Sequence, residues 1–174
     1  MPDYHVGYLK GAYKGDGHFV RETDGKLKTA TIRVCDKNFS EAIYNACQQA
    51  FDHSLKMREA VITKTKKTQY QYNWFPRQYV GILYDQPTNK EQRRGFVAGF
   101  YDAEGWCTYG EVKMAQVKKA PLELIGSILD EFKIDFRLRE QNRPGTLVPI
   151  SWLLTVWTTS RSDFFQIFEP KKGR

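Results

Sequence analysis

Two acidic residues, Asp16 and Glu104, end two segments of the chain that repeat each other at an offset of 88 residues. The first segment, residues 7–17, reads GYLKGAYKGDG, and the second, residues 95–105, reads GFVAGFYDAEG. A duplicated element that carries one carboxylate per copy predicts two carboxylates brought together about a pseudo-two-fold axis. Paired carboxylates are what the metal-assisted cleavage of a phosphodiester requires.

Small residues recur every four positions in both segments, so in a helix they share one face. They are Gly7, Gly11 and Gly15 in the first copy, and Gly95, Gly99 and Ala103 in the second. A glycine inside a helix costs about 1 kcal/mol relative to alanine, so this repetition needs a structural reason. We expect two helices that cross closely at their glycines, because no side chain would hold the backbones apart.

Composition and charge favour a globular protein with a nucleic acid partner. Hydrophobic residues make up 41% of the chain and charged residues 27%, and the net charge of +7 is shared by both halves. No apolar run approaches the roughly 20 residues that span a bilayer, and no secretory signal is visible, so we expect a cytoplasmic protein with no membrane partner. An odd count of three cysteines without CxxC spacing favours reduced thiols.

The order of predicted elements is the same in both halves. The first half reads as a helix over 3–14, strands over 18–23 and 26–35, a helix over 38–51, and strands over 55–64 and 68–74. The second half, after its own glycine-rich helix, reads as strands over 106–109 and 112–117, a helix over 120–132, strands over 136–141 and 147–157, and a closing helix over 160–168. This pattern predicts a duplicated αββαββ(α) unit of the α+β class with two four-stranded antiparallel sheets. The repeats are assigned to residues 1–84 and 90–174, with 85–89 as the linker.

The two motifs and this order of elements resemble the LAGLIDADG homing endonucleases in their monomeric two-repeat form, and the size is similar to that of the enzymes encoded in archaeal ribosomal RNA introns. The namesake pattern falls on residues 9–17 and 97–105. The second copy is the better match. The first departs from the pattern at Lys10, Lys14 and Gly15.

The resemblance implies a saddle-shaped pair of sheets astride double-stranded DNA, with the motif helices at its centre. It implies a monomer that needs no protein partner and cuts both strands of a long target. Asp16 and Glu104 would hold Mg²⁺ at the scissile phosphates, with the preceding Gly15 and Ala103 counted in the metal site, and Ca²⁺ or Mn²⁺ substituting in crystals. Residues that match by helix position would assist catalysis: Asp36 and Lys37 in the first half, Lys118 and Lys119 in the second. Asp36 could instead cap the helix that begins near Asn38.

Alternate polar residues of the strands are predicted to face the DNA, where arginine and glutamine side chains can pair with base edges. The candidates in the first half are Arg21, Thr29, Thr31, Arg33, Lys56, Arg58, Gln69, Gln71 and Asn73, and those in the second are Lys113, Arg137, Arg139, Gln141 and Arg143. Four further basic residues, Lys64, Lys66, Lys67 and Arg77, are predicted to meet phosphates. Because the two halves differ at most of these positions, we expect a non-palindromic target.

Two other functions are compatible with the same sequence. An RNA maturase, or a sequence-specific DNA-binding protein without catalytic activity, could use this scaffold. An enzyme acting on small molecules is disfavoured because the chain has no nucleotide-binding loop or cofactor motif. The two retained acids favour the endonuclease.

Overall fold

The computed structural model describes residues 2–62, 65–72, 75–142, 144 and 150–172. These residues form two compact units. The first contains the described residues up to Ala103 together with Lys171 and Lys172, and the second contains Glu104–Pro170. No helix among the described residues is both long and apolar enough to cross a membrane. The repeat boundaries and the linker at 85–89 stay a prediction.

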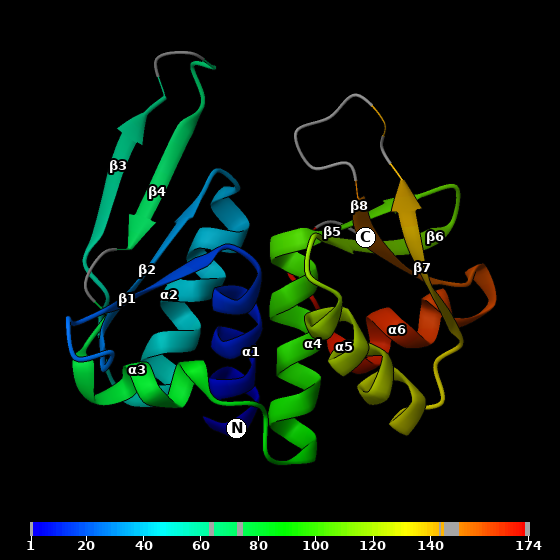
Figure 1. Ribbon diagram of the computed structural model, residues 1–174, viewed down its shortest axis with the longest axis horizontal. Coiled ribbons are helices and arrows are strands. Elements are labelled where there is room, and N and C mark those ends of the chain that lie inside the picture. Colours follow the sequence, from blue (N-terminus) through cyan, green and yellow to red (C-terminus); the bar gives the residue numbers. More distant parts are fainter. Residues whose placement is uncertain (1, 63–64, 73–74, 143, 145–149, 173–174) are drawn as a thin grey trace. The chain divides into compact units, whose positions relative to one another are not determined.

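The first unit contains one four-stranded sheet and four helices. Its elements are α1 (Pro2–Gly15), β1 (Gly17–Arg21), β2 (Leu27–Val34), α2 (Lys37–Phe51), β3 (Met57–Val61), β4 (Thr68–Tyr72), α3 (Arg77–Tyr84) and α4 (Lys90–Glu104), whose final residue belongs to the second unit. The strands are antiparallel and lie in the order β1-β2-β4-β3 (Figure 1).

The second unit repeats this arrangement. Its elements are β5 (Gly105–Thr108), β6 (Glu111–Gln116), α5 (Lys119–Glu131), β7 (Phe136–Asn142), β8 (Ile150–Val156), the short 3-10 helix η1 (Thr158–Ser160) and α6 (Arg161–Phe168). The antiparallel strands lie in the order β5-β6-β8-β7, which is the order of the first sheet. The predicted fold class, a duplicated α+β unit with two four-stranded antiparallel sheets, is confirmed.

The alternation of apolar and polar residues in β2 determines which face of the first sheet is buried. Ala30, Ile32 and Val34 are almost completely buried, whereas Arg33 between them is exposed. Ile32 pairs with Tyr72 of β4, whose hydroxyl is hydrogen-bonded to the carbonyl oxygen of Ser40 in α2 at 2.9 Å. The helices therefore cover one face of this sheet, and the opposite face carries the polar side chains.

Helices α1 and α4 pack side by side within the first unit at the predicted glycines (Figure 1). A Cβ built on Gly11 would meet the carbonyl oxygen of Phe96 and lie 2.7 Å from the amide nitrogen of Phe100. In return, a Cβ built on Gly99 would meet the carbonyl oxygen of Tyr8 and lie 2.9 Å from the amide nitrogen of Ala12. Each helix thus places its backbone against the backbone of the other, as the glycine spacing predicted.

Replacing Gly11 with alanine should destabilise the first unit by about 1–3 kcal/mol, because the new methyl group would push two backbones apart. Gly81→Ala is the matched control, since the same substitution in α3 would meet nothing within 4 Å. That control should be neutral or gain up to about 1 kcal/mol from better helix propensity. Urea unfolding of both variants measures the difference, and equal stabilities would contradict the close crossing.

Candidate functional site

An open pocket of about 640 Å³ lies at the C-terminal ends of α1 and α4 within the first unit. Helix α1 ends at Gly15, and the amide of Asp16 still donates to the carbonyl oxygen of Ala12 at 3.0 Å. This hydrogen bond holds Asp16 at the C-terminal end of α1, where the residue is exposed. The pocket is lined by Asp16, Val34, Cys35, Asp36, Phe39, Lys67, Thr68, Asp102, Ala103 and Lys172.

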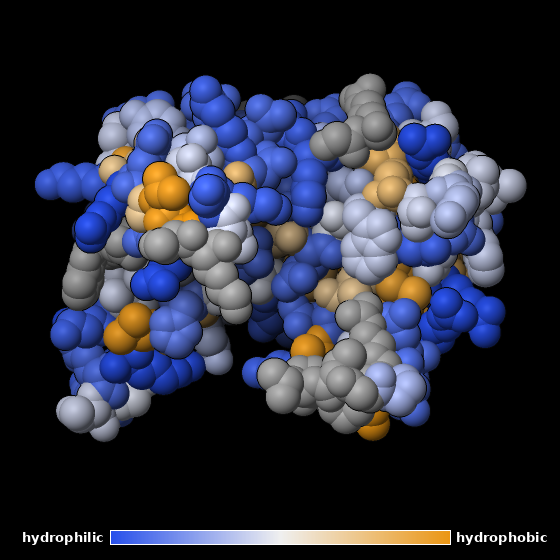
Figure 2. Space-filling model, turned by 90° about the horizontal axis from the view of Figure 1, so that it is seen from above, coloured by the Kyte–Doolittle hydropathy of each residue, from blue (hydrophilic) through white to orange (hydrophobic). Residues whose placement is uncertain are grey.

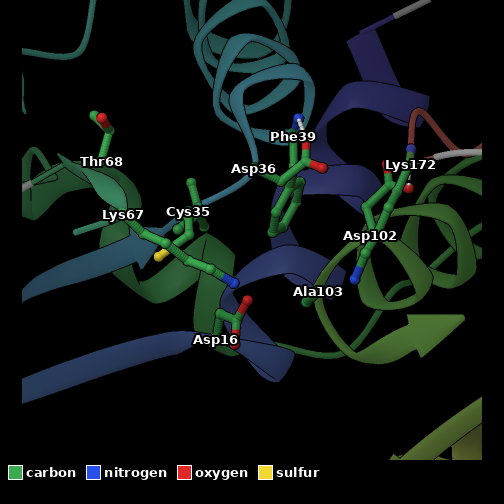
Figure 3. Close-up of a pocket in the computed structure, with 10 residues that line it drawn as sticks. Asp16, Cys35, Asp36, Phe39, Lys67, Thr68, Asp102, Ala103 and Lys172 are labelled. Atoms are coloured by element: carbon green, nitrogen blue, oxygen red, sulfur yellow. Dashed lines mark hydrogen bonds between the residues drawn. The ribbon is translucent and has the colours of Figure 1, made fainter. Parts of the chain in front are cut away.

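Both carboxylates and ammonium groups gather in this pocket (Figure 3). Asp16 and Asp36 come from the ends of α1 and β2, and both residues are exposed. Lys67, which immediately precedes β4, extends its side chain toward Asp16, and Lys172 comes from the C-terminal segment of the chain. The pocket therefore combines acids that can bind a cation with bases that can bind an anion.

Asp36 is the N-cap of α2. Its Oδ1 atom accepts a hydrogen bond of 2.8 Å from the amide of Phe39, and the residue has extended backbone angles. The capping role that the sequence left open for Asp36 is thereby confirmed. One carboxylate oxygen is used in this way, and the residue still lines the pocket beside Asp16.

The three lysines predicted to assist catalysis do not line this pocket. Lys37 is exposed, lies 3.8 Å from Glu41, and lines a different cavity between α2 and the strands β3 and β4. Lys118 is the N-cap residue of α5 in the second unit, without a side-chain capping bond. Lys119 forms an ion pair of 2.9 Å with Glu123 and lies over the ring of Trp152. Their roles in catalysis stay predictions.

Glu104 is the last residue of α4 and is held by an amide from its own unit. The Nε2 atom of Gln116, the final residue of β6, donates a hydrogen bond of 3.0 Å to Oε1 of Glu104. The Oε1 atom of Gln116 in turn accepts from the amide of Val117 at 2.9 Å, which fixes the orientation of the glutamine. No local sequence pattern marks this glutamine, because its position becomes informative only once β5 and β6 are paired. The juxtaposition of Asp16 with Glu104 stays a prediction.

The donor atoms around Asp16 fit a hard divalent cation. Mg²⁺ binds through carboxylate oxygens, keeps several waters, and is commonly held by one or two carboxylates together with substrate phosphates. Over the described part of the chain, no group of three or more His, Cys, Asp or Glu side chains is gathered to hold a metal. A site of the carboxylate-plus-phosphate kind needs no such group. Gly15 and Ala103, the residues before the two acids, are both half-buried.

A third acid, Asp102, is buried in the same region and already bound by donors. Its carboxylate accepts from the hydroxyl of Tyr8 at 2.6 Å and from the amides of Lys171 and Lys172 at 2.8 and 2.7 Å. Burial raises the pKa of Asp102, while these hydrogen bonds act in the opposite direction. The same burial raises the pKa of Tyr8 well above its ordinary value. Asp102 therefore has a structural role: it joins α1 and the C-terminal segment in the wall of the pocket.

The exposed face of the first sheet carries a row of polar side chains. Arg33 of β2 is paired with Gln71 of β4, and Gln71 is paired with Arg58 of β3, so the three residues lie in line across the sheet. The amide of Gln71 also donates to Oε1 of Gln69 at 2.7 Å. Seen from above, the surface of this unit is largely hydrophilic (Figure 2). Such a row can donate paired hydrogen bonds to base edges.

The other residues predicted to contact DNA differ in their exposure to solvent. Thr29 does not have the predicted exposed side chain: it is buried, and its hydroxyl donates to the carbonyl oxygen of Phe75 at 3.1 Å, because the segment after β4 covers this end of β2. The exposed candidates are Arg21, Arg33, Lys56, Arg58, Lys66, Lys67, Arg77, Arg137 and Arg139, and the half-buried ones are Thr31, Gln69, Gln71, Lys113 and Gln141. Lys64, Asn73 and Arg143 lie outside the described residues.

Several of these candidates have partners within the protein. Arg77 forms a two-point contact with Glu22, at 3.2 and 3.3 Å, and Lys113 lies 2.8 Å from Glu111. Arg21 donates to the carbonyl oxygen of Gly25 at 2.7 Å. A bound phosphate would have to compete with these partners, so Arg33 and Arg58 are the better-placed candidates for a contact with DNA.

Comparison with known proteins defines the class to which this fold belongs. Residues 91–168 match the family described as the LAGLIDADG-like domain. The whole chain is similar to solved structures of the homing endonuclease I-DmoI, with a TM-score of 0.70 at 16% identity over 97% of both chains. It is also similar to the N-terminal LAGLIDADG domain of DUF199/WhiA, with a TM-score of 0.69 at 12% identity over 99% of this chain and 86% of that one. None of the curated proteins compared with this sequence matches it.

The fold is therefore that of a protein built from two α+β repeats, each with its own four-stranded sheet. Residues 91–168 match the LAGLIDADG-like domain family, and the chain shares the two-repeat fold of the homing endonuclease I-DmoI. The resemblance predicted from the two glycine-rich segments is confirmed.

Replacing Asp36 with alanine should destabilise the first unit by about 1 kcal/mol, because the amide of Phe39 loses its capping acceptor. Asp36→Asn removes the charge but keeps a capping oxygen, so its stability should stay close to that of the wild type. Urea unfolding of the two variants separates the cap from the charge. A variant Asp36→Asn that is as unstable as Asp36→Ala would show that the capping bond is not the stabilising contact.

Proposed function

We propose that this protein is a site-specific DNA endonuclease that hydrolyses phosphodiesters of both strands with a divalent metal. The observation that carries the proposal is the pocket at the end of α1, where the exposed carboxylate of Asp16 lies among the basic residues Lys67 and Lys172. The fold supports it, because the similar homing endonuclease I-DmoI was solved in complex with DNA and Mn and with DNA and Ca.

The position of Asp16 favours a cation. A carboxylate at the C-terminal end of a helix is disfavoured by the helix dipole, which places partial negative charge there. A bound cation reverses that interaction and also relieves the repulsion between neighbouring carboxylates. Asp16 and Glu104, one from each repeat, are the residues that would hold Mg²⁺, and Gln116 would keep Glu104 oriented. When bound, the metal supplies charge neutralisation at the phosphate and lowers the pKa of its water.

The remaining side chains of the pocket act on the DNA backbone. The side chain of Lys67, which immediately precedes β4, extends into the pocket, where its ammonium group would attract a phosphate and hold it beside Asp16 (Figure 3). The row formed by Arg33, Gln71 and Arg58 would read bases in the major groove. The sheet would recognise the target sequence and the pocket would cleave the phosphodiester, as a site-specific endonuclease requires.

Asp16→Asn and Glu104→Gln should each lower the rate of double-strand cleavage by about 10³-fold or more, because the metal's contribution to the transition state is several kcal/mol. Binding should change little, since most affinity comes from other phosphate contacts. The target is a duplex obtained by rounds of binding from a randomised DNA pool in Ca²⁺, and cleavage is then started with Mg²⁺.

Asp24→Asn is the matched control for charge, because Asp24 is an exposed turn residue that pairs with Lys26 at 2.8 Å. It should cleave at the wild-type rate. Persistent cleavage in Asp16→Asn and Glu104→Gln would overturn the proposed metal site. Tight binding by the wild type without any cleavage would favour the DNA-binding protein instead.

Arg33→Ala should weaken binding to the selected target by about 1–3 kcal/mol and relax the base preference at one position. Lys26→Ala, in the turn between β1 and β2, is the control and should preserve that preference. Binding of both variants to all single-base variants of the target gives the measurement. A uniform loss of affinity across the variants would mean that Arg33 contacts a phosphate rather than a base.

A further inference from the structure

The C-terminal segment of the chain returns to the first unit and is fixed there by one buried carboxylate. Asp102, in the last turn of α4, is only 1% exposed. Its Oδ2 atom accepts from the amide of Lys171 and its Oδ1 atom from the amide of Lys172, at 2.8 and 2.7 Å. The hydroxyl of Tyr8, which is 2% exposed, donates to Oδ2 at 2.6 Å. Charge-assisted hydrogen bonds of this kind are strong when they are buried.

This anchor decides which of two neighbouring lysines reaches the pocket. Both backbone amides are bound to Asp102, but the side chain of Lys171 is exposed, whereas Lys172 is half-buried and lines the pocket with Asp16 and Ala103 (Figure 3). Among the described residues, the ammonium group of Lys172 forms no hydrogen bond and no ion pair within 4 Å, although its charge attracts the carboxylate of Asp102. A lysine held in a pocket in this way is available for an anion.

The anchor is present in one repeat only. The position of the first repeat that corresponds to Asp102 is occupied by Lys14, which is exposed. A lysine cannot accept the two amides, so Lys14 cannot hold a backbone segment as Asp102 does. The tail contact is therefore a feature that distinguishes the two halves of this molecule.

We propose that Lys172 is a functional part of the site, and that Asp102 holds the backbone amides of residues 171 and 172 so that the side chain of Lys172 binds a DNA phosphate beside Asp16. This inference rests on the proposed function and adds a positioning residue to it. Lys172 supplies positive charge from the far end of the chain, at a place where the two motifs themselves supply carboxylates. Lys171 has the same charge, but its side chain is exposed and does not line the pocket.

The test uses the full-length chain and two variants, Lys172→Ala and the matched control Lys171→Ala. The probe is the duplex selected from the randomised pool, with affinity measured in Ca²⁺ over a range of salt concentrations. Lys172→Ala should reduce the slope of log affinity against log salt by about 1, because one phosphate contact is lost. Lys171→Ala should leave the slope unchanged. Lys172→Arg should restore it.

Cleavage in Mg²⁺ gives the second measurement. Lys172→Ala should lower the single-turnover rate by about 10- to 100-fold, the effect expected when a hydrogen bond to a charged group is lost. Lys171→Ala should cleave at the wild-type rate. Equal behaviour of the two alanine variants, in slope and in rate, would overturn the proposal. If the wild type binds but does not cleave, the endonuclease assignment fails and the salt slope still decides the role of Lys172.

Hydrogen exchange tests the anchor without reference to activity. The amides of residues 171 and 172 should both be protected in the wild type and in Lys172→Ala. In Asp102→Asn at least one of them should lose its protection, because asparagine keeps only one accepting oxygen. Asp102→Asn should also reproduce the salt slope of Lys172→Ala. Unchanged protection of both amides in Asp102→Asn would overturn the anchoring role of this carboxylate.

Discussion

The direct contact between the backbones of α1 and α4 is the constraint on which the described site depends. At Gly11 and at Gly99, the space that a side chain would need is occupied by the carbonyl oxygen of a residue on the other helix. This contact places the end of α1, with Asp16, in the same pocket as Ala103 of α4. It also brings Tyr8 to Asp102 at 2.6 Å, so the buried hydrogen bond exists only because the helices are so close.

The charged groups of the pocket are positioned in two different ways. The acids stand at the ends of regular elements, where the backbone fixes them: Asp16 follows α1, and Asp36 caps α2. The bases reach the pocket on long side chains from the residue before β4 and from the C-terminal segment. Carboxylates fixed by the backbone suit a cation that demands a strict coordination geometry. Ammonium groups on flexible side chains can adjust to the position of a bound anion.

Periodicity accounts for what could be predicted of the fold. The four-residue glycine spacing predicted the crossing of α1 and α4, and the alternation of polar residues along β2 predicted the exposed side chain of Arg33. The same alternation was wrong for Thr29, because burial there is imposed by the segment around Phe75, which is distant in sequence. For Asp36 the sequence left two roles open, and the bond to the amide of Phe39 shows that it caps the helix.

The sequence by itself determined the duplication, the class of fold and the two acids that end the motifs, because these follow from local spacing and from comparison of one half with the other. Only the tertiary structure decided which basic residues accompany Asp16. Lys172 lies 156 positions along the chain from Asp16, and no local pattern relates them. Their association depends on the three donors that Asp102 accepts, and those donors meet only after α1, α4 and the C-terminal segment have packed together.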